Sequence, residues 1–357
     1  MKNQFPNWRG ESSSDPLEAL IDVFLNDVRR RYFAQKVLEL AQAENNPSNW
    51  SRLDEIMLDA ARDLATVIPS GQVSRVRAEM QERIDQYEID KAEGKIAGIL
   101  CGIPLFDDLT DGFQQGDIVT VAGYSGRGKS MLSGFFLANA IDQGKNALLM
   151  SLEMSTRQIM DRFDTMTMKF SHKQLRKREL PDEEIENWRR TAQKYENAKN
   201  DLIVADKLGN CTIDRVYAEI NRYKPDITCV DYVQLMKGSK SSMAKWEGIV
   251  EITNELKSIA LATDSTIIMV SQDQRNSANE GSTESNMGGS ISVLQAADIY
   301  IGMFQDEEMR EQKKLNTRLI KNRNGSPGEQ DIIFDPEFMR FGPWESSVTV
   351  FDKGAAV

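Results

Sequence analysis

The sequence predicts an α/β protein with a mainly parallel sheet, and three observations lead to that fold class. Short apolar runs rich in β-branched residues alternate with helical stretches, which is typical of parallel strands joined by crossover helices. A glycine-rich loop at residues 123–130 separates one apolar run from a helical stretch. Nearer the C-terminus, two apolar runs are separated only by a turn, which indicates an antiparallel hairpin added to the sheet.

The strands expected in the parallel part are residues 118–122, 146–152, 202–205, 227–231, 266–271 and 299–304. The helical stretches between and after them are residues 131–141, 157–169, 182–199, 213–222 and 246–262. Residues 315–321 and 330–334 form the expected hairpin, because the intervening Asn324–Gly328 is rich in turn formers.

The chain divides into five predicted segments. Residues 1–14 are a polar, serine-rich tail that we expect to be disordered, and residues 15–69 are a small helical N-terminal domain. Residues 70–97 form a linker that contains an amphipathic helix, residues 98–345 form the α/β domain, and residues 346–357 form a C-terminal tail. The apolar stripe of the linker helix must be buried, either on its own domain or on a neighbouring subunit.

Composition bounds the function of this 357-residue chain. No run of 18 apolar residues occurs, and the polar N-terminus lacks the apolar core of a secretory signal, so we expect a cytoplasmic protein without a membrane partner. The net charge of −11 argues against a protein that coats nucleic acid nonspecifically. It does not exclude DNA binding, because an acidic ring can still present local cations and backbone amides to a central strand.

Cysteine and histidine usage excludes several kinds of site. The three cysteines have neither the number nor the spacing of a disulfide framework or a zinc site, and Cys229 is expected to be a small buried hydrophobe. His172 is the only histidine, so neither a histidine-based metal site nor a Ser-His-Asp triad is expected. Its polar helical surroundings predict that it is solvated.

The loop at residues 123–130 fits the pattern G-x-x-x-x-G-K-[ST] and follows an apolar strand. Glycines at these positions let backbone N–H groups turn inward around phosphates, and the following helix places its partial positive charge there. The expected cradle is Ser125, Gly126, Arg127, Gly128, Lys129, Ser130 and Met131. Lys129 is expected to reach the β- and γ-phosphates, and the Ser130 hydroxyl to join the shell of Mg²⁺.

Three other predicted strands end in polar side chains. Asp231 is the expected partner of Ser130 in holding Mg²⁺. Glu153 can polarise the water that attacks the γ-phosphate, or else it helps to cap the following helix together with Ser155. Gln272 can sense the γ-phosphate, or else it is an ordinary loop residue. Ligands bind at the carboxyl edge of an open α/β sheet, which is where all three are expected.

Lys321 and Arg323 are spaced to project from the same face of one hairpin strand. Two such cations are either a solvated sheet edge or finger-type groups that act in a neighbouring subunit's site.

The stretch Asn276–Ser292 combines glycines with many Ser and Asn residues between two core strands. It is either a long surface loop or a loop whose backbone amides contact a nucleic-acid strand.

These residues together resemble the DnaB family of hexameric replicative DNA helicases, which are RecA-like ATPases, over about residues 96–342. The motifs that carry the resemblance are Ser125–Ser130, Ser151–Ser155 with Gln158 and Arg162, Val230–Met236, Ser271 and Gln272 with Arg275, Gln295–Asp298, and Lys321–Gly325. The resemblance implies an ATP hydrolase and 5′ to 3′ DNA helicase that uses Mg²⁺ and moves on single-stranded DNA as a homo-hexamer. It also implies a primase and a helicase loader as candidate partners.

The resemblance also implies roles for particular residues. Glu153 corresponds to the glutamate that activates water, Lys321 and Arg323 to groups that act in trans, and Arg162 belongs to a motif beside the nucleotide. Gly288, Gly289 and Ser290 fall in the family's DNA-contacting loop, with Arg275 close by in sequence. The helix at residues 72–92 takes the place of the family's linker helix, which docks on the adjacent subunit.

Three departures accompany the resemblance. The loop before Asp298 is about two residues longer than is usual, Asp273 replaces an apolar residue, and only residues 28–68 resemble the family's larger N-terminal domain. The short N-terminal region is compatible with a phage or plasmid replication system. Two other functions remain open on sequence alone: a RecA-like recombinase or DNA-remodelling ATPase, and a nucleotide-dependent loader or scaffold.

Overall fold

The computed structural model describes residues 76–92, 94, 98–196, 198–206, 211–236, 245–272 and 291–350. The predicted N-terminal tail and helical domain at residues 1–69 lie outside the described residues, as do residues 273–290 and 351–357. The account of the sheet and its helices below therefore concerns residues 98–350.

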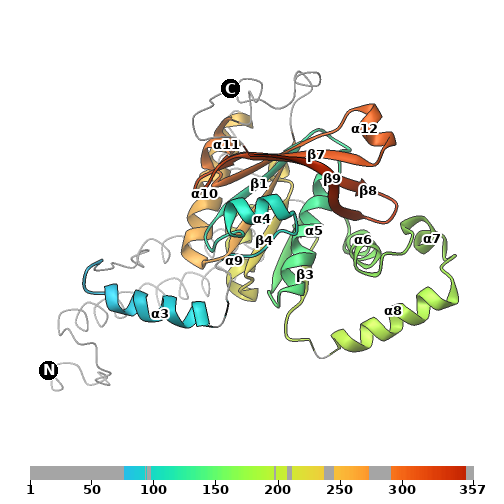
Figure 1. Cartoon of the computed structure of the whole chain (residues 1–357), viewed down its shortest axis with the longest axis horizontal. Helices are drawn as coiled ribbons and strands as arrows, with labels where there is room; N and C mark the ends of the chain where they lie inside the picture. Colours follow the sequence, from blue (N-terminus) through green and yellow to red (C-terminus); the bar gives the residue numbers. More distant parts are fainter. Residues whose placement is uncertain are drawn as a thin grey trace, which may run out of the picture. The chain divides into compact units, whose positions relative to one another are not determined.

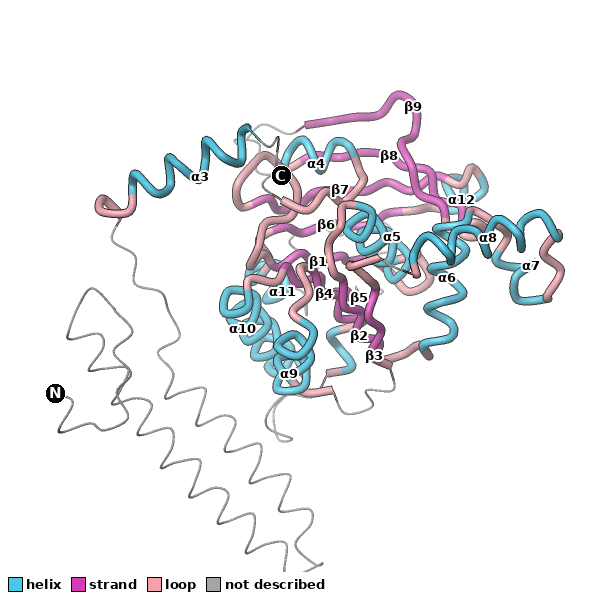
Figure 2. The backbone as a smooth tube through the Cα atoms, turned by 90° about the horizontal axis from the view of Figure 1, so that it is seen from below, coloured by secondary structure: helices cyan, strands magenta, loops and turns pink. Residues whose placement is uncertain are grey.

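One sheet of nine strands organises this part of the chain, in the order β3-β2-β4-β5-β1-β6-β7-β8-β9 (Figures 1 and 2). The strands are β1 (Ile118–Gly123), β2 (Ala147–Ser151), β3 (Leu202–Ala205), β4 (Ile227–Asp231), β5 (Thr266–Gln272), β6 (Ile299–Phe304), β7 (Lys314–Asn322), β8 (Gly328–Asp335) and β9 (Arg340–Val350). All pairs from β3 to β6 are parallel, and those from β6 to β9 are antiparallel. The predicted α/β class is thus confirmed.

Strand β1 is the central strand of the nine-stranded sheet, between β5 and β6, and all six of its residues are buried. Its side chains alternate between two apolar cores, as a strand's period of two requires. Val119 and Val121 belong to one core, whereas Ile118 and Ala122 belong to the other. Because both faces are covered, the strand reads in sequence as a continuous apolar run.

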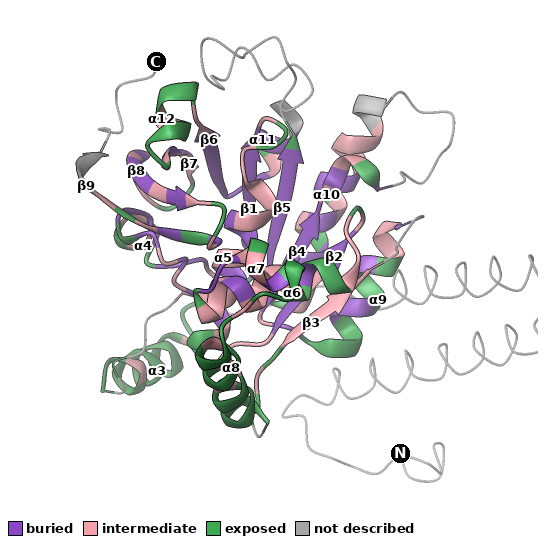
Figure 3. Cartoon of the chain, turned by 90° about the vertical axis from the view of Figure 1, so that its right-hand side faces the viewer, coloured by how far each residue is buried: buried purple, intermediate pink, exposed green. Residues whose placement is uncertain are grey.

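The helices are α4 (Pro104–Thr110), α5 (Lys129–Asp142), α6 (Thr156–Met168), α7 (His172–Lys177), α8 (Asp182–Tyr195), α9 (Ile213–Tyr223), α10 (Lys245–Thr263), α11 (Ile291–Ala296) and α12 (Glu307–Glu311), with the short 3₁₀ helix η2 at Val233–Leu235. Residues of α4 and α5, such as Phe106 and Phe136, fill the core on one face of the sheet. Residues of α9 and α10, such as Ile220 and Leu256, fill the core on the other face. Figure 3 shows the buried strands between these layers, and the largely exposed α8 outside them.

The predicted hairpin is confirmed as β7 and β8, and β9 adds a third strand that pairs with β8 and continues to Val350. Two local expectations are wrong. Helix α8 ends at Tyr195 rather than at residue 199. His172 is half-buried rather than solvated, and its Nδ1 lies 3.1 Å from the Thr165 hydroxyl oxygen.

Helix α3 (Met80–Ala92) lies within the predicted linker and buries none of its residues. Met80, Ile84 and Tyr87 are 50%, 44% and 66% exposed, and they recur at helical spacing. Within the part of the chain that the structure describes, the stripe expected from the sequence is therefore an exposed apolar face. Among the described residues, no helix combines the length and the apolar character needed to cross a membrane.

Candidate nucleotide-binding and catalytic site

The loop at residues 123–130 joins the carboxyl end of β1 to the first turn of α5. Gly126 and Gly128 have φ angles of +77° and +85°, in the left-handed region that side-chain-bearing residues rarely adopt. Gly128 caps α5 directly, so the loop's backbone amides and the positive end of the helix dipole meet at the same place. This geometry is that of an anion site suited to phosphates. Ser125, Arg127 and Met131, the other residues of the expected cradle, lie within the loop and the first turn of α5.

Lys129 and Ser130 begin α5, and their polar atoms face the loop and β4. The Lys129 ammonium donates a hydrogen bond to the Tyr124 carbonyl oxygen at 2.8 Å, which holds it against the loop. Ser130 forms a side-chain hydrogen bond with the Asp231 carboxylate at the end of β4. A hydroxyl and a carboxylate are the hard oxygen ligands that Mg²⁺ takes when substrate phosphates and water supply the rest. The pair therefore fits Mg²⁺, although no cluster of three or more metal-binding side chains occurs among the described residues.

Asp231 is 8% exposed, and the groups around it shift the pKa of its carboxyl in opposite directions. Burial raises the pKa of the Asp231 carboxyl; the Ser130 hydrogen bond and the charges of Lys129 and Arg162 act to lower it, and Glu153 acts to raise it. The same kinds of cause shift the pKa of Arg162, on α6, in the opposite direction. Burial lowers the pKa of its guanidinium, while Asp231 and Glu153 act to raise it. The predicted residues Lys129, Ser130, Glu153, Arg162 and Asp231 thus form one cluster.

Glu153 is exposed just beyond the end of β2. The alternative role of capping α6 belongs to its neighbour Ser155, which forms a reciprocal capping box with Gln158. Gln272 ends β5, and its backbone lies in register with Gly123, the first residue of the loop. Its exposed side chain therefore lies at the sheet edge that carries the loop.

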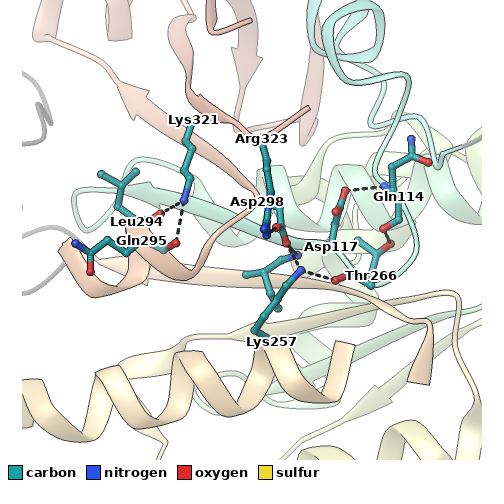
Figure 4. Close-up of polar contacts among 11 residues, drawn as sticks. Gln114, Asp117, Lys257, Thr266, Leu294, Gln295, Asp298, Lys321 and Arg323 are labelled. Atoms are coloured by element: carbon teal, nitrogen blue, oxygen red, sulfur yellow. Dashed lines mark hydrogen bonds and ion pairs between the residues drawn. The ribbon is translucent and has the colours of Figure 1, made fainter. Parts of the chain in front are cut away.

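Lys321 and Arg323 lie at the opposite edge of the sheet from the nucleotide loop, where the parallel strands begin rather than end. Lys321 is near the end of β7. The last residue of that strand, Asn322, pairs with Ile299 at the start of β6. Arg323 directly follows β7 and is not part of it. The Lys321 ammonium donates to the carbonyl oxygens of Leu294 and Gln295 at 3.0 and 2.9 Å. Arg323 donates to the Asp298 carboxylate at 2.8 Å (Figure 4). The structure does not bring this pair to the chain's own nucleotide loop.

Some predicted residues fall outside the described part of the chain: Arg275, Gly288, Gly289 and Ser290. Conversely, sequence reasoning missed Phe334 of β8, whose ring lies against Gly128. It also gave no role to Asp298 or Lys257, although Asp298 ends one of the motifs. No local sequence signal predicts contacts between such distant positions.

A hollow of about 580 Å³ lies between α5, α6 and α8, away from the nucleotide loop. Phe163, Asp164 and Trp188 are among the residues that line it. Burial raises the pKa of the Asp164 carboxyl to about 6. The nucleotide site is nevertheless assigned to the loop, because the loop carries the amides, the lysine and the metal-binding oxygens that a triphosphate needs.

The sheet and the loop together define a RecA-like P-loop ATPase. Residues 98–343 match the family model of the DnaB-like helicase C terminal domain, so the chain belongs to the DnaB-like helicase family. The predicted family, fold class and helicase function are therefore confirmed.

Curated relatives span most of this chain. The replicative DNA helicase DnaB of Geobacillus stearothermophilus is 24% identical over 347 residues, covering 91% of this chain and 75% of the relative. The replicative DNA helicase DnaB of Haemophilus influenzae is 27% identical over 357 residues, covering 92% and 75%.

Two solved structures share the fold. A separately solved ATPase domain matches with a TM-score of 0.69 and 21% identity, over 77% of this chain and all of that domain. A DnaB-like replicative helicase, solved to describe its interactions with primase, matches with a TM-score of 0.73 and 19% identity over 92% of this chain and 78% of that one.

Proposed function

We propose that this chain is a replicative DNA helicase that hydrolyses ATP at the interfaces of a homo-hexameric ring and moves 5′ to 3′ on single-stranded DNA. The helicase class is that of the family. One observation of the structure supports the interfacial site: the nucleotide loop and the pair Lys321 and Arg323 lie at opposite edges of one sheet. Each chain therefore carries two halves of different sites.

The distance between the two edges supports action in trans. Arg323 bonds to Asp298, and Asp298 in turn accepts from the backbone N–H of Ile118, the first residue of β1. The nucleotide loop begins at Gly123, the last residue of that six-residue strand. At about 3.3 Å per residue, the strand spans roughly 17 Å, which exceeds the length of an arginine side chain. This length favours a neighbouring copy as the source of the Arg323 that reaches the loop.

The residues of the loop edge have distinct tasks in this proposal. Lys129 and the loop amides bind the phosphates, Ser130 and Asp231 hold the metal, and Arg162 adds positive charge beside them. Bound Mg²⁺ would neutralise charge on the β- and γ-phosphate oxygens. Glu153 would orient and deprotonate the attacking water, and the Gln272 amide would sense the γ-phosphate. Lys321 and Arg323 of the neighbour would stabilise the charge that develops during transfer.

The apolar face of α3 supports the oligomer. Met80, Ile84 and Tyr87 are exposed in the isolated chain, and an apolar stripe of this kind marks an interaction surface. We assign this face to docking on the adjacent subunit, as the linker position predicts.

Further parts of the proposal rest on the family resemblance. They are contact of Gly288, Gly289, Ser290 and Arg275 with single-stranded DNA, partnership with a primase and a loader, and action in the cytoplasm of a bacterial cell or a phage-infected host. One structural relative bears a title that names interactions with primase.

The decisive experiment is unwinding of a forked DNA duplex. Wild-type protein should separate a fork with a 5′ single-stranded tail in the presence of ATP and Mg²⁺, and it should fail on a duplex with only a 3′ tail. Lys129→Ala should lose both unwinding and hydrolysis, because the phosphates lose their lysine. Lys173→Ala, which changes an exposed lysine on α7, is the matched control and should behave as wild type.

Two results would overturn the proposal. Hydrolysis of ATP without strand separation, together with filaments in electron micrographs, would indicate a recombinase-like ATPase. ATP turnover at the background rate would indicate a loader or scaffold.

A further inference from the structure

Asp298 precedes β6, and its carboxylate is almost completely buried, with a side chain that is 3% exposed. Three donors surround it (Figure 4). The Lys257 ammonium lies at 2.5 Å, the Ile118 backbone N–H at 2.9 Å and the Arg323 guanidinium at 2.8 Å. A buried carboxylate with two cationic partners is costly to assemble unless its partners satisfy it fully, as these do. The cluster has no role in the nucleotide half-site described above.

The two carboxylate oxygens have different partners. Oδ2 accepts from Lys257 and Ile118, and Lys257 also donates to the Gly116 carbonyl oxygen at 2.9 Å. This oxygen is therefore tied to α10 and to the start of β1. Oδ1 accepts from Nη1 of Arg323. The nearby Asp117 accepts from the Gln114 backbone N–H instead. Asp298, rather than Asp117, is thus the carboxylate that accepts a hydrogen bond from Arg323.

Arg323 is fixed to Asp298 twice over. Its backbone N–H donates to the Asp298 carbonyl oxygen at 2.9 Å, and its guanidinium donates to the carboxylate. The guanidinium nevertheless remains 67% exposed. A guanidinium has five N–H donors in a rigid fork, so the bond from Nη1 leaves donors to point outward.

Electrostatics keep the cluster charged. Burial acts to raise the pKa of Asp298, but the hydrogen bonds from Lys257, Ile118 and Arg323 outweigh it, so the pKa lies below its ordinary value. The hydrogen bond to Asp298 raises the pKa of Arg323. Lys257 offsets the charge of Asp298, and the nearby Asp117 also acts to raise the pKa of the exposed Arg323.

We propose that Asp298 is a positioning residue for the trans-acting Arg323, holding one guanidinium nitrogen so that the others face the neighbouring subunit's γ-phosphate. Lys257 offsets the charge of Asp298, so that the carboxylate that holds Arg323 is not left as an uncompensated buried charge. This inference rests on the proposed interfacial site. An unrestrained arginine would have to lose its rotamer freedom during each catalytic event, whereas Asp298 orders it beforehand.

The test uses the paired substitution Asp298→Asn with Lys257→Met, which removes the charge of the buried carboxylate together with that of its half-buried partner and leaves neither unpaired. We expect kcat for DNA-stimulated ATP hydrolysis to fall about tenfold, with little change in KM, because the finger acts mainly in the transition state. Arg323→Ala should lose considerably more, on the order of a thousandfold. Asp331→Asn with Lys314→Met removes another ion pair, of 2.6 Å and similar burial, and should leave kcat unchanged.

Mixed rings separate positioning from damage to the fold. In a mixture with Glu153→Gln protein, the paired variant supplies a complete nucleotide half, and its Glu153→Gln neighbour supplies a correctly held Arg323. We expect hydrolysis to exceed the sum of the two separate proteins. Absence of this rescue, where Arg323→Ala is rescued by the same partner, would mean that Asp298 acts on its own nucleotide half and would overturn the inference.

Other outcomes are equally distinguishable. Wild-type kcat in the paired variant, with Arg323→Ala inactive, would overturn positioning while leaving the interfacial site intact. Full activity of Arg323→Ala would instead refute the interfacial site, and this inference with it. If the paired variant unfolds at a lower temperature than the Asp331 control, the single variant Asp298→Asn replaces it in the same mixing experiment.

Discussion

Gly128 shows at the scale of single residues why the nucleotide loop tolerates so few substitutions. Its φ of +85° disfavours any side chain, and a Cβ there would lie 2.5–3.1 Å from three atoms of the Phe334 ring. Phe334 is itself stacked on Phe341, with ring centroids 5.0 Å apart. The Phe334 ring therefore packs against the loop, and its contact with Phe341 leaves it little room to move away from Gly128. Gly126 has a similar φ, but nothing lies within 4 Å of its Cβ position.

We expect Gly128→Ala to destabilise the protein more than Gly126→Ala. Left-handed strain costs each variant about 1–2 kcal/mol, and overpacking against Phe334 adds about 1–3 kcal/mol to Gly128→Ala alone. Denaturant unfolding without nucleotide measures the difference in the free energy of unfolding. Adding Phe334→Leu should return part of the loss. Equal losses in the two glycine variants would show that the ring does not constrain the loop.

The nucleotide half of the site can be predicted from sequence for a local reason. The tasks of Lys129 and Ser130 depend on a short contiguous segment, and Asp231 follows from its place at a strand end. Phe334 and Lys257 could not be predicted in this way, because they meet Gly128 and Asp298 through pairing and packing between distant segments. His172 was misjudged for a related reason: its partner Thr165 is on another helix.

At the scale of elements, the positions of the parallel strands and of the helices between them along the chain follow from apolar runs and their spacing, whereas their order in the sheet does not. The least predictable element was β9. Its sequence contains Gly342 and Pro343, which disfavour a strand interior, yet it lies at the sheet edge, where an unpaired position is tolerated. The segment 273–290 carries the predicted DNA contacts, which stay predictions.

Helices α6 and α8 meet at a titratable contact. Asp164 of α6 lies in the hollow beside Trp188 of α8, which forms a side-chain hydrogen bond with it. Burial raises the pKa of Asp164 to about 6 from an ordinary value of 3.8. The native state therefore holds this proton at a higher pH than the unfolded state does. The contribution to stability is complete below about pH 4 and is lost as the pH rises through about 6.

Asp164→Asn should accordingly be more stable than wild type at pH 7, by about 1 kcal/mol after allowance for solvent screening. At pH 4 the two proteins should differ little, because an asparagine resembles a protonated aspartate and can still accept from Trp188. Urea unfolding at a series of pH values measures this difference. A difference in stability that does not change between pH 4 and pH 7 would contradict the assigned cause.

At the scale of the whole molecule, the proposed docking of α3 on a neighbouring subunit would link the stability of the assembly to catalysis. We expect Tyr87→Glu to weaken the oligomer, because it places a charge on a face that is apolar and 66% exposed in the single chain. Light scattering should then show smaller species at a given concentration, and ATP hydrolysis should fall with them.

Tyr217→Glu is the matched control, since Tyr217 of α9 is also exposed, at 41%, but lies outside the docking face. It should assemble and hydrolyse ATP as wild type does. Wild-type assembly by Tyr87→Glu would argue that α3 packs within its own subunit.

The separation of the loop and the cation pair across one sheet has an arithmetical consequence. A closed ring has as many complete sites as subunits. An open row of subunits always has one fewer, because the nucleotide loop at one end has no neighbour to supply Lys321 and Arg323. Turnover per subunit should therefore rise with protein concentration and level off at closure. Opening the ring to admit a DNA strand would silence at least one site until the gap closes again.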